Sequence, residues 1–439
     1  MNRSVLAVLL GGEPIGEVRR AASGLLEFGY DHDYARGPEA VPLSVSMPLS
    51  RPAHPHSTIS PWLWGLLPDS DDVRRRWAGE FGVPASDPFG LLGTPIGHDC
   101  AGAVQFCRPD ELNWLSERGG GVAPLSEGGV ASRLRALQED ENAWLDPRIH
   151  LQFSLAGGQR KTALHHTGME WGIPWGAVPT THILKPAIRG LPWTDVNEHL
   201  CLTAARILGL AAARTSLVRF EEQIAVAVQR FDRLNRDGVL WRIHQEDFCQ
   251  ALGVDPRLKY QSDGGPGAAD IADALRHHVP EGRAGTDLAR LSDALAFNWL
   301  VGAPDAHAKN YSLLLDHRGG RLAPLYDVIS AVPYGGDGRP PIRLAMRIGS
   351  HDRLDEINRR DWGVVAAQLH LSPSALAERI LDMVRRLPYA FEQAATDPSV
   401  QTVADTFAQR MIELMADRAR ECSALISLDG PPLGPAGAN

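Results

Sequence analysis

The stretch Ala303-Pro304-Asp305-Ala306-His307-Ala308-Lys309-Asn310 places an aspartate five positions before an asparagine. On one tight loop the carboxylate can accept the proton of a hydroxyl group, while the amide oxygen can ligate Mg²⁺. A lysine in the same loop can neutralise phosphate charge. An aspartate and an asparagine at this spacing also occur often by chance, so the surrounding segments decide what the loop means.

The D-x-x-x-x-N spacing is that of a kinase catalytic loop, and further elements in kinase order lie upstream. Residues 156–161 (AGGQRK) are a glycine-containing loop between two expected strands, 149–155 and 162–165. Successive backbone N–H groups of such a loop can cradle phosphate oxygens. The loop matches neither a Walker A motif nor G-x-G-x-x-G, and taken alone it is more simply a hairpin turn.

Three ionisable residues extend the pattern. Lys185 ends the strand expected at 181–185, and Glu198 lies in the first turn of the amphipathic helix expected at 196–208. In a kinase small lobe the strand lysine grips the α- and β-phosphates and the helix glutamate holds that lysine. Asp327 follows a further expected strand, where a second Mg²⁺-holding carboxylate belongs. Taken alone, Lys185 is more simply a solvent-exposed lysine, and Asp327 is a residue that caps a turn. In this order the three residues predict a kinase site.

The lysine count supports a special role for these positions. Of 44 basic residues only four are lysine, namely Lys161, Lys185, Lys259 and Lys309. A compact ammonium on a flexible stem reaches places that a branched guanidinium does not fit. Three of the four lysines fall in the expected phosphate loop, strand end and catalytic loop, whereas the sequence assigns no role to Lys259.

Bulk composition excludes several classes of protein. The chain has 439 residues, a length at which two or three folding units are expected. Its residues are 44% hydrophobic and 22% charged, which are ordinary values for a globular protein. No apolar run reaches the length of a membrane span, so a cytoplasmic protein without membrane contact is expected. The five cysteines form no C-x-x-C pair and are expected to be free thiols. The net charge of −9 does not favour nucleic-acid binding by overall charge, although a local arginine patch remains able to contact DNA.

Periodicity predicts an α+β chain with an N-terminal β-rich subdomain and a mostly α-helical C-terminal lobe, and the kinase order of the motifs predicts a bilobal, protein-kinase-like fold. The expected division is an N-terminal α+β unit at 1–110, a connecting segment at 111–148, a small lobe with the phosphate loop at 149–235, a helical large lobe at 236–426 and a disordered tail at 427–439. Helices are expected at 246–252, 271–279, 288–301, 374–386 and 403–425. Ser70 is an expected N-cap.

The chain resembles the HipA family of bacterial serine/threonine kinase toxins along nearly its whole length. The matching segments read PLSVSMPL at 42–49, GLLPDS at 65–70, IGHDCAGAV at 96–104, FSLAGGQRKTAL at 153–164, TTHILK at 180–185, QRFDR at 229–233, QEDFCQ at 245–250, KYQSDGGPG at 259–267, the loop at 305–310 and YDVIS at 326–330. This ordered set is far more specific than any single motif. The chain departs from the family pattern at Pro304, Ala306, Gln229 and Arg160, and none of these changes removes a catalytic group.

The resemblance implies a role for each matching residue. Asp305 would be the catalytic base, Asn310 and Asp327 would hold Mg²⁺, and Lys185 would contact the phosphates of ATP. The remaining ATP-binding positions it implies are Ala156, Gly157, Gly158, Gln159, Arg160 and Lys161 in the phosphate loop, Gln229, Arg230 and Phe231 at the adenine hinge, and His307, Ala308, Lys309 and Tyr326. Ser154 matches the regulatory autophosphorylation serine of the family, where an added phosphate would repel or eject the neighbouring loop.

The resemblance also implies partners. Members of the family are held by a small helix-turn-helix antitoxin, HipB, and reach operator DNA through that complex. Their substrates are aminoacyl-tRNA synthetases, glutamyl-tRNA synthetase in particular. Two other functions stay open on the sequence: a DNA-bound co-repressor with vestigial kinase activity, and a phosphotransferase acting on small molecules.

Overall fold

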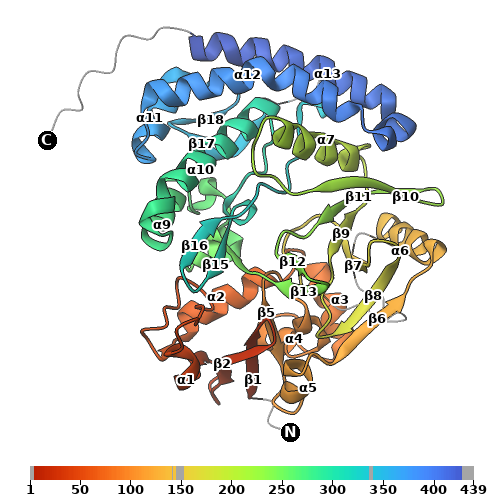
Figure 1. The fold of residues 1–439 in the computed structure, drawn as a ribbon, viewed down its shortest axis with the longest axis vertical. Helices are drawn as coiled ribbons and strands as arrows, with labels where there is room; N and C mark the ends of the chain where they lie inside the picture. The colour runs from red at the N-terminus through yellow and green to blue at the C-terminus, as the bar shows by residue number, and fades with distance from the viewer. Residues whose placement is uncertain (1–3, 141, 145–152, 336–339, 428–439) are drawn as a thin grey trace, which may run out of the picture.

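A computed structural model describes residues 4–140, 142–144, 153–335 and 340–427. Its first part is a sheet-based unit, and the chain then builds a second sheet before ending in a stack of long helices (Figure 1). The expected strand at 149–155 and the expected tail at 427–439 lie mostly outside the described residues. No helix in the described ranges is long and apolar enough to cross a membrane.

The N-terminal unit is a five-stranded antiparallel sheet in the order β4-β3-β2-β1-β5. Its strands are β1 (Val5–Leu10), β2 (Glu13–Arg20), β3 (Leu26–Tyr30), β4 (Ala53–His54) and β5 (Val104–Cys107). Its helices are α1 (His32–Ala35), α2 (His56–Leu66), α3 (Asp71–Phe81), α4 (Pro88–Leu92) and α5 (Leu112–Ser116), with a 3₁₀ turn at Pro95–His98. The Ser70 hydroxyl accepts from the Val73 N–H and caps α3, as expected.

The second sheet has six strands in the order β10-β11-β9-β7-β8-β6. They are β6 (Gly120–Pro124), β7 (Thr162–His166), β8 (Trp171–Gly176), β9 (His182–Lys185), β10 (Thr215–Phe220) and β11 (Gln223–Gln229). Helices α6 (Glu127–Glu139) and α7 (Thr194–Ile207) pack against its strands. The segment expected to be a connection, 111–148, therefore contributes the edge strand β6 to this sheet and the helix α6 that packs against it. A strand can be recruited this way because antiparallel pairing needs only backbone groups.

The C-terminal part is mostly helical, as expected. It contains α8 (Phe248–Ala251), α9 (Ala268–His278), α10 (Glu281–Val301), α11 (Arg359–Gln368), α12 (Pro373–Ala395) and α13 (Pro398–Ser427). Small sheets join it: β12 (Arg233–Arg236) with β13 (Val239–Arg242), β14 (His244–Asp247) with β15 (Ser312–Asp316) and β16 (Gly319–Leu322), and β17 (Arg343–Ile348) with β18 (His351–Arg353). In Figure 1, α12 and α13 lie at the end of the molecule opposite the N-terminal unit.

One expected helix is shorter than predicted. Residues 246–252 were expected to be helical, but Glu246 and Asp247 end strand β14, which pairs with β15, and only Phe248–Ala251 form a turn of helix. The Asp247 carboxylate accepts from the Gln250 N–H and caps that turn. Tertiary pairing with β15 thus overrides the local apolar pattern.

Two large hydrophobic cores and one small cluster lie among the described residues. The larger core joins the C-terminal helices, α7 and one face of β11. The second core runs without interruption from the N-terminal sheet through α6 to the second sheet, and it includes Phe28, Trp62, Trp77, Phe153 and Leu184. The N-terminal unit is therefore packed against the second sheet as one body with it.

Candidate active site

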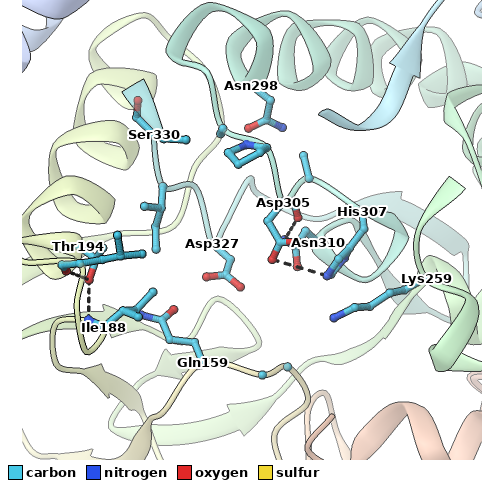
Figure 2. A pocket seen from close by; sticks show the side chains of 18 of the residues that line it. Gln159, Ile188, Thr194, Lys259, Asn298, Asp305, His307, Asn310, Asp327 and Ser330 are labelled. Carbon is cyan, nitrogen blue, oxygen red and sulfur yellow. Dashed lines mark hydrogen bonds and ion pairs between the residues drawn. The ribbon is translucent and has the colours of Figure 1, made fainter. Parts of the chain in front are cut away.

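The loop that follows α10 carries the carboxylate expected to act as a base. Gly302 ends the helix in the left-handed conformation, with φ of 64°, and turns the chain into the loop. The Asn310 side-chain amide donates to the Asp305 carbonyl oxygen at 2.6 Å, so the loop is closed on itself. The Asp305 side chain is 64% exposed and projects into a cavity of about 560 Å³ (Figure 2).

Tyr260 is bonded directly to this carboxylate. Its hydroxyl donates to Asp305 Oδ1 at 2.8 Å, whereas Oδ2 lies 3.9 Å from His307 Nε2, beyond hydrogen-bond distance, and stays open to another partner. Protein atoms around the cavity desolvate the group and raise the pKa of Asp305; the Tyr260 hydrogen bond opposes that rise, and the charge of Asp327 adds to it. The tyrosine lies in the segment at 259–267, to which no role in the site was assigned from the sequence.

Lys185 and its partners form the charged centre of the site. The Lys185 ammonium lies 2.7 Å from Glu198 Oε1 on α7 and 2.7 Å from Asp327 Oδ1. Burial opposes the positive charge, but the two carboxylates outweigh it and raise the pKa of Lys185. Strand pairing sets this position, because Lys185 lies opposite Val226 in the sheet. The structure thus brings together the lysine, glutamate and aspartate that the sequence placed in kinase order.

Asp327 is held in an unusual backbone conformation. Its φ is 58°, in the left-handed region that non-glycine residues seldom occupy. Residues held in such strained conformations cluster at functional sites. The ammonium groups of Lys185 and Lys161 outweigh its burial and hold its pKa at about 2. A fully ionised carboxylate is therefore aimed into the same cavity as Asp305 (Figure 2).

Asn310 and Asp327 suit a magnesium ion. The Asn310 NH₂ is engaged with the loop, so its amide oxygen is free to ligate, and Asp327 keeps one oxygen beyond the one that Lys185 holds. Such hard oxygen ligands are those that Mg²⁺ prefers. In the described parts of the chain no three His, Cys, Asp or Glu side chains are grouped to hold a metal.

The expected phosphate loop leads into β7. Gly157 has φ of 101°, and the Lys161 ammonium donates to the Ala156 carbonyl at 2.6 Å and lies over the Trp144 ring. Burial, together with the charge of Lys185, lowers the pKa of Lys161 to about 8. Gly157, Gly158, Gln159 and Arg160 line the cavity, but the Arg160 guanidinium donates to carbonyl oxygens at the end of α6 and so anchors the loop.

The expected hinge borders a second cavity of about 140 Å³ that shares Asp327, His307 and Asn310 with the first. Gln229, Phe231 and Tyr326 line it, with the two aromatic rings 5.4 Å apart. Arg230 also lines it, although its guanidinium is bonded to Asp232 and Thr180 in a buried network.

Of the other residues expected to contact the nucleotide, His307 and Lys309 line the second cavity and Ala308 does not. Burial, with the nearby charge of Lys259, lowers the pKa of His307 to about 4. The His307 ring is therefore neutral at pH 7. Ala308 is fully buried and lines neither cavity, so its side chain faces the protein interior. Its main-chain N–H donates to the Lys259 carbonyl oxygen at 3.3 Å.

Ser154 is fully buried against the N-terminal unit. Its hydroxyl donates to the Leu66 carbonyl at 2.8 Å, and its main-chain N–H donates to the Asp99 carbonyl at 2.8 Å. Gly65 and Ala101 of the same unit line the second cavity. Sequence reasoning missed this contribution, because it treated the N-terminal unit as separate from the site.

Two models of known protein families match the chain. Residues 153–391 match the model of the HipA-like C-terminal domain, and residues 6–107 match that of the HipA N-terminal domain. The chain belongs to the HipA family. HipA-family membership confirms the resemblance found in the sequence and the expected α+β, kinase-like fold.

Individual HipA relatives cover almost the whole chain. A Sinorhizobium fredii protein named "Putative kinase Y4mE" is 34% identical over 96% of this chain and 99% of its own length. The "Serine/threonine-protein kinase toxin HipA" of Shewanella oneidensis is 29% identical over 88% of each chain. The solved structure of Shewanella oneidensis MR-1 HipA, in complex with HipB and its operator DNA, superposes with a TM-score of 0.79 at 25% identity, covering 96% of this chain and 98% of that one. The present chain is thus a HipA-like serine/threonine kinase, and kinase homology implies the use of ATP.

Proposed function

We propose that this HipA-family chain transfers the γ-phosphoryl group of ATP, with Mg²⁺, to serine or threonine hydroxyls of a protein. The observation that carries the proposal is the convergence of Lys185, Glu198, Asp305, Asn310 and Asp327 on adjoining cavities. Phosphoryl transfer requires little covalent chemistry from the protein, so positioning and charge stabilisation are what these residues must supply.

Each residue has a step in this proposal. Adenine enters the cavity beside Phe231 and Tyr326, and Lys185 holds the α- and β-phosphates while Glu198 orients it. Asp305 accepts the hydroxyl proton on Oδ2, because Tyr260 already donates to Oδ1. Asn310 and Asp327 would hold Mg²⁺, which would supply positive charge beside the phosphates of ATP.

We further infer that the chain is the toxin of a two-protein module. The support is its similarity to a named HipA toxin and to a HipA structure solved with HipB and operator DNA. The proposed partners are a HipB-like helix-turn-helix antitoxin and, through it, operator DNA. The proposed substrate is a protein of the aminoacyl-tRNA synthetase class, glutamyl-tRNA synthetase first, which follows from the family resemblance.

Autophosphorylation of Ser154 is part of the proposal and has a structural requirement. The hydroxyl is fully buried, so the segment that carries it must leave the Leu66 carbonyl before a phosphate can be added. A phosphate bearing nearly two negative charges could not return to that site. Modification would therefore keep the phosphate loop displaced.

Intact-mass analysis after incubation with Mg-ATP tests both the kinase activity and its target. We expect one added phosphate on the wild type and none on either Asp305→Ala or Ser154→Ala. No phosphate on the wild type would contradict autophosphorylation, and the same phosphate on Asp305→Ala would contradict the assigned base. Unchanged toxicity of Asp305→Ala, expressed without antitoxin, would favour a DNA-bound co-repressor instead.

A further inference from the structure

Asp69 of the N-terminal unit reaches the catalytic loop. It precedes α3, and its side chain lies between two lysines: Oδ2 accepts from the Lys259 ammonium at 2.8 Å and Oδ1 accepts from the Lys309 ammonium at 2.5 Å. The exposed fractions of these side chains are 21% for Asp69, 16% for Lys259 and 3% for Lys309. Two of the four lysines of the chain therefore share one carboxylate.

The same residue also touches the phosphate loop. The Asp69 main-chain N–H donates to the Gly157 carbonyl at 3.1 Å, and Pro68 forms a parallel bridge with Gly157. Through its side chain Asp69 contacts Lys309, which immediately precedes Asn310. One residue thus joins the phosphate loop to the catalytic loop.

The second arm of this contact leads to the base. Lys259 precedes Tyr260, whose hydroxyl donates to Asp305, and the Lys259 carbonyl accepts from the Ala308 N–H. Figure 2 shows Lys259 directed toward the cavity that holds Asp305 and Asp327. Fixing the Lys259 side chain therefore also constrains the tyrosine that orients the base.

We propose that Asp69 is a positioning residue, which holds Lys259 and Lys309 in the places where they face the γ-phosphoryl group. The inference rests on the proposed kinase function and adds to it a residue from outside the kinase lobes. Lysine side chains lose considerable rotamer freedom on being ordered, and Asp69 orders two of them before ATP arrives. One carboxylate between two ammonium groups relieves their repulsion yet leaves one net positive charge for the phosphate.

Charge balance supports this positioning role. Burial opposes ionisation of Asp69, but the two ammonium groups outweigh it and keep its pKa well below the usual range. Asp69 is thus ionised throughout the working range of pH. The neighbouring acids on α3 behave differently, since Asp71 and Asp72 pair with Arg74 and Arg75 within the same helix and do not reach the catalytic loop.

The test compares Asp69→Asn, which keeps the shape and removes the charge, with Asp72→Asn as matched control. The rate of phosphate incorporation from radiolabelled Mg-ATP is measured against ATP concentration, and Tm is measured in parallel. We expect the maximal rate of Asp69→Asn to fall about tenfold or more, while the half-saturating ATP concentration changes less than about threefold. Asp72→Asn should stay within about twofold of wild type in both.

A double-variant cycle separates positioning from a general structural role. If Asp69 acts through the lysines, Asp69→Asn should cost much less in a Lys259→Met background than in the wild type. Asp69→Glu, which restores the charge, should recover part of the rate. The proposal would be overturned if the rate loss of the double variant equalled the product of the two single losses. It would also be overturned if a folded Asp69→Asn kept the wild-type rate.

Two further results, a variant that does not fold and an inactive wild type, can be told apart from the outcomes above. If Asp69→Asn does not fold, Lys259→Met alone tests the contact: a reduced maximal rate supports the proposal and a wild-type rate overturns it. A wild type that incorporates no phosphate contradicts the kinase function itself, whereas an active wild type with an equally active Asp69→Asn contradicts only the positioning role.

Discussion

At the scale of single residues, the side chains of the site are specified by charge and length together. The Lys185 side chain is 7% exposed, and its ammonium contacts two carboxylates, each at 2.7 Å. A point charge can sit between two oxygens in this way, whereas a guanidinium is larger and presents its donors in a flat fork. The scarcity of lysine in an arginine-rich chain is therefore consistent with selection by geometry at this position.

Lys185→Arg tests that statement. Arginine keeps the charge, so we expect the protein to fold with a Tm near that of wild type. We expect phosphate transfer to fall about a hundredfold, because the atoms proposed to hold the phosphates move. Phosphate incorporation from Mg-ATP measures the loss, and Arg135→Lys, on the exposed face of α6, is the control that should retain full activity. An active Lys185→Arg would mean that the sparse lysines reflect chance.

At the scale of elements, the phosphate loop depends on one glycine more than on its neighbour. A Cβ on Gly157 would lie 2.8 Å from the Lys161 ammonium in a backbone conformation with φ of 101°, whereas a Cβ on Gly158 would meet nothing within 4 Å. Only at Gly157, therefore, are both the backbone and the lysine that closes the loop disturbed by a side chain.

Gly157→Ala should raise the half-saturating ATP concentration about tenfold, since backbone strain at such a position costs about 1–3 kcal/mol. Gly158→Ala, the matched control, should change it by no more than about twofold. Nucleotide titration of both variants, with Tm as a check on folding, measures the difference. Equal affinities in the two variants would show that the loop tolerates a side chain at either glycine.

At the scale of the whole molecule, the N-terminal unit and the kinase lobes are joined by buried polar contacts as well as by a shared core. Asp99 accepts from Arg233 at 2.9 Å and also from Arg230 and Arg242, close to the hinge. Buried ion pairs are costly to break on one side, because a charge is then left without a partner. Variants of Asp99 should therefore disturb both stability and the nucleotide site.

His244 gives this junction a pH dependence. Its ring is bonded to the Leu43 carbonyl, and burial lowers its pKa to about 4, with the Leu43 hydrogen bond opposing that shift. The unfolded state takes up a proton below about pH 6.5, but the folded state does so only near pH 4. Stability from His244 is thus complete above pH 6.5 and is lost as the pH falls toward 4.

We expect the Tm of the wild type to fall between pH 6.5 and 4.5, and to fall less steeply in His244→Gln, whose amide can still donate to Leu43. His317→Gln, on the exposed turn between β15 and β16, should follow the wild type. Thermal melts at several pH values measure the slopes. Parallel slopes in wild type and His244→Gln would contradict the assignment.

The family, the order of the candidate catalytic elements and most of the helices follow from the sequence alone, because these are local signals carried by spacing and periodicity. Other features depend on tertiary packing: β6 pairs with β8 at the edge of the second sheet, α6 packs against that sheet, Ser154 is buried against Leu66, and Lys259 has a partner. The Asp69 contacts join residues 190 and 240 positions apart, at which distance no periodicity links the partners. Packing of the N-terminal unit against the kinase lobes, and not any motif, brings that carboxylate to the catalytic loop.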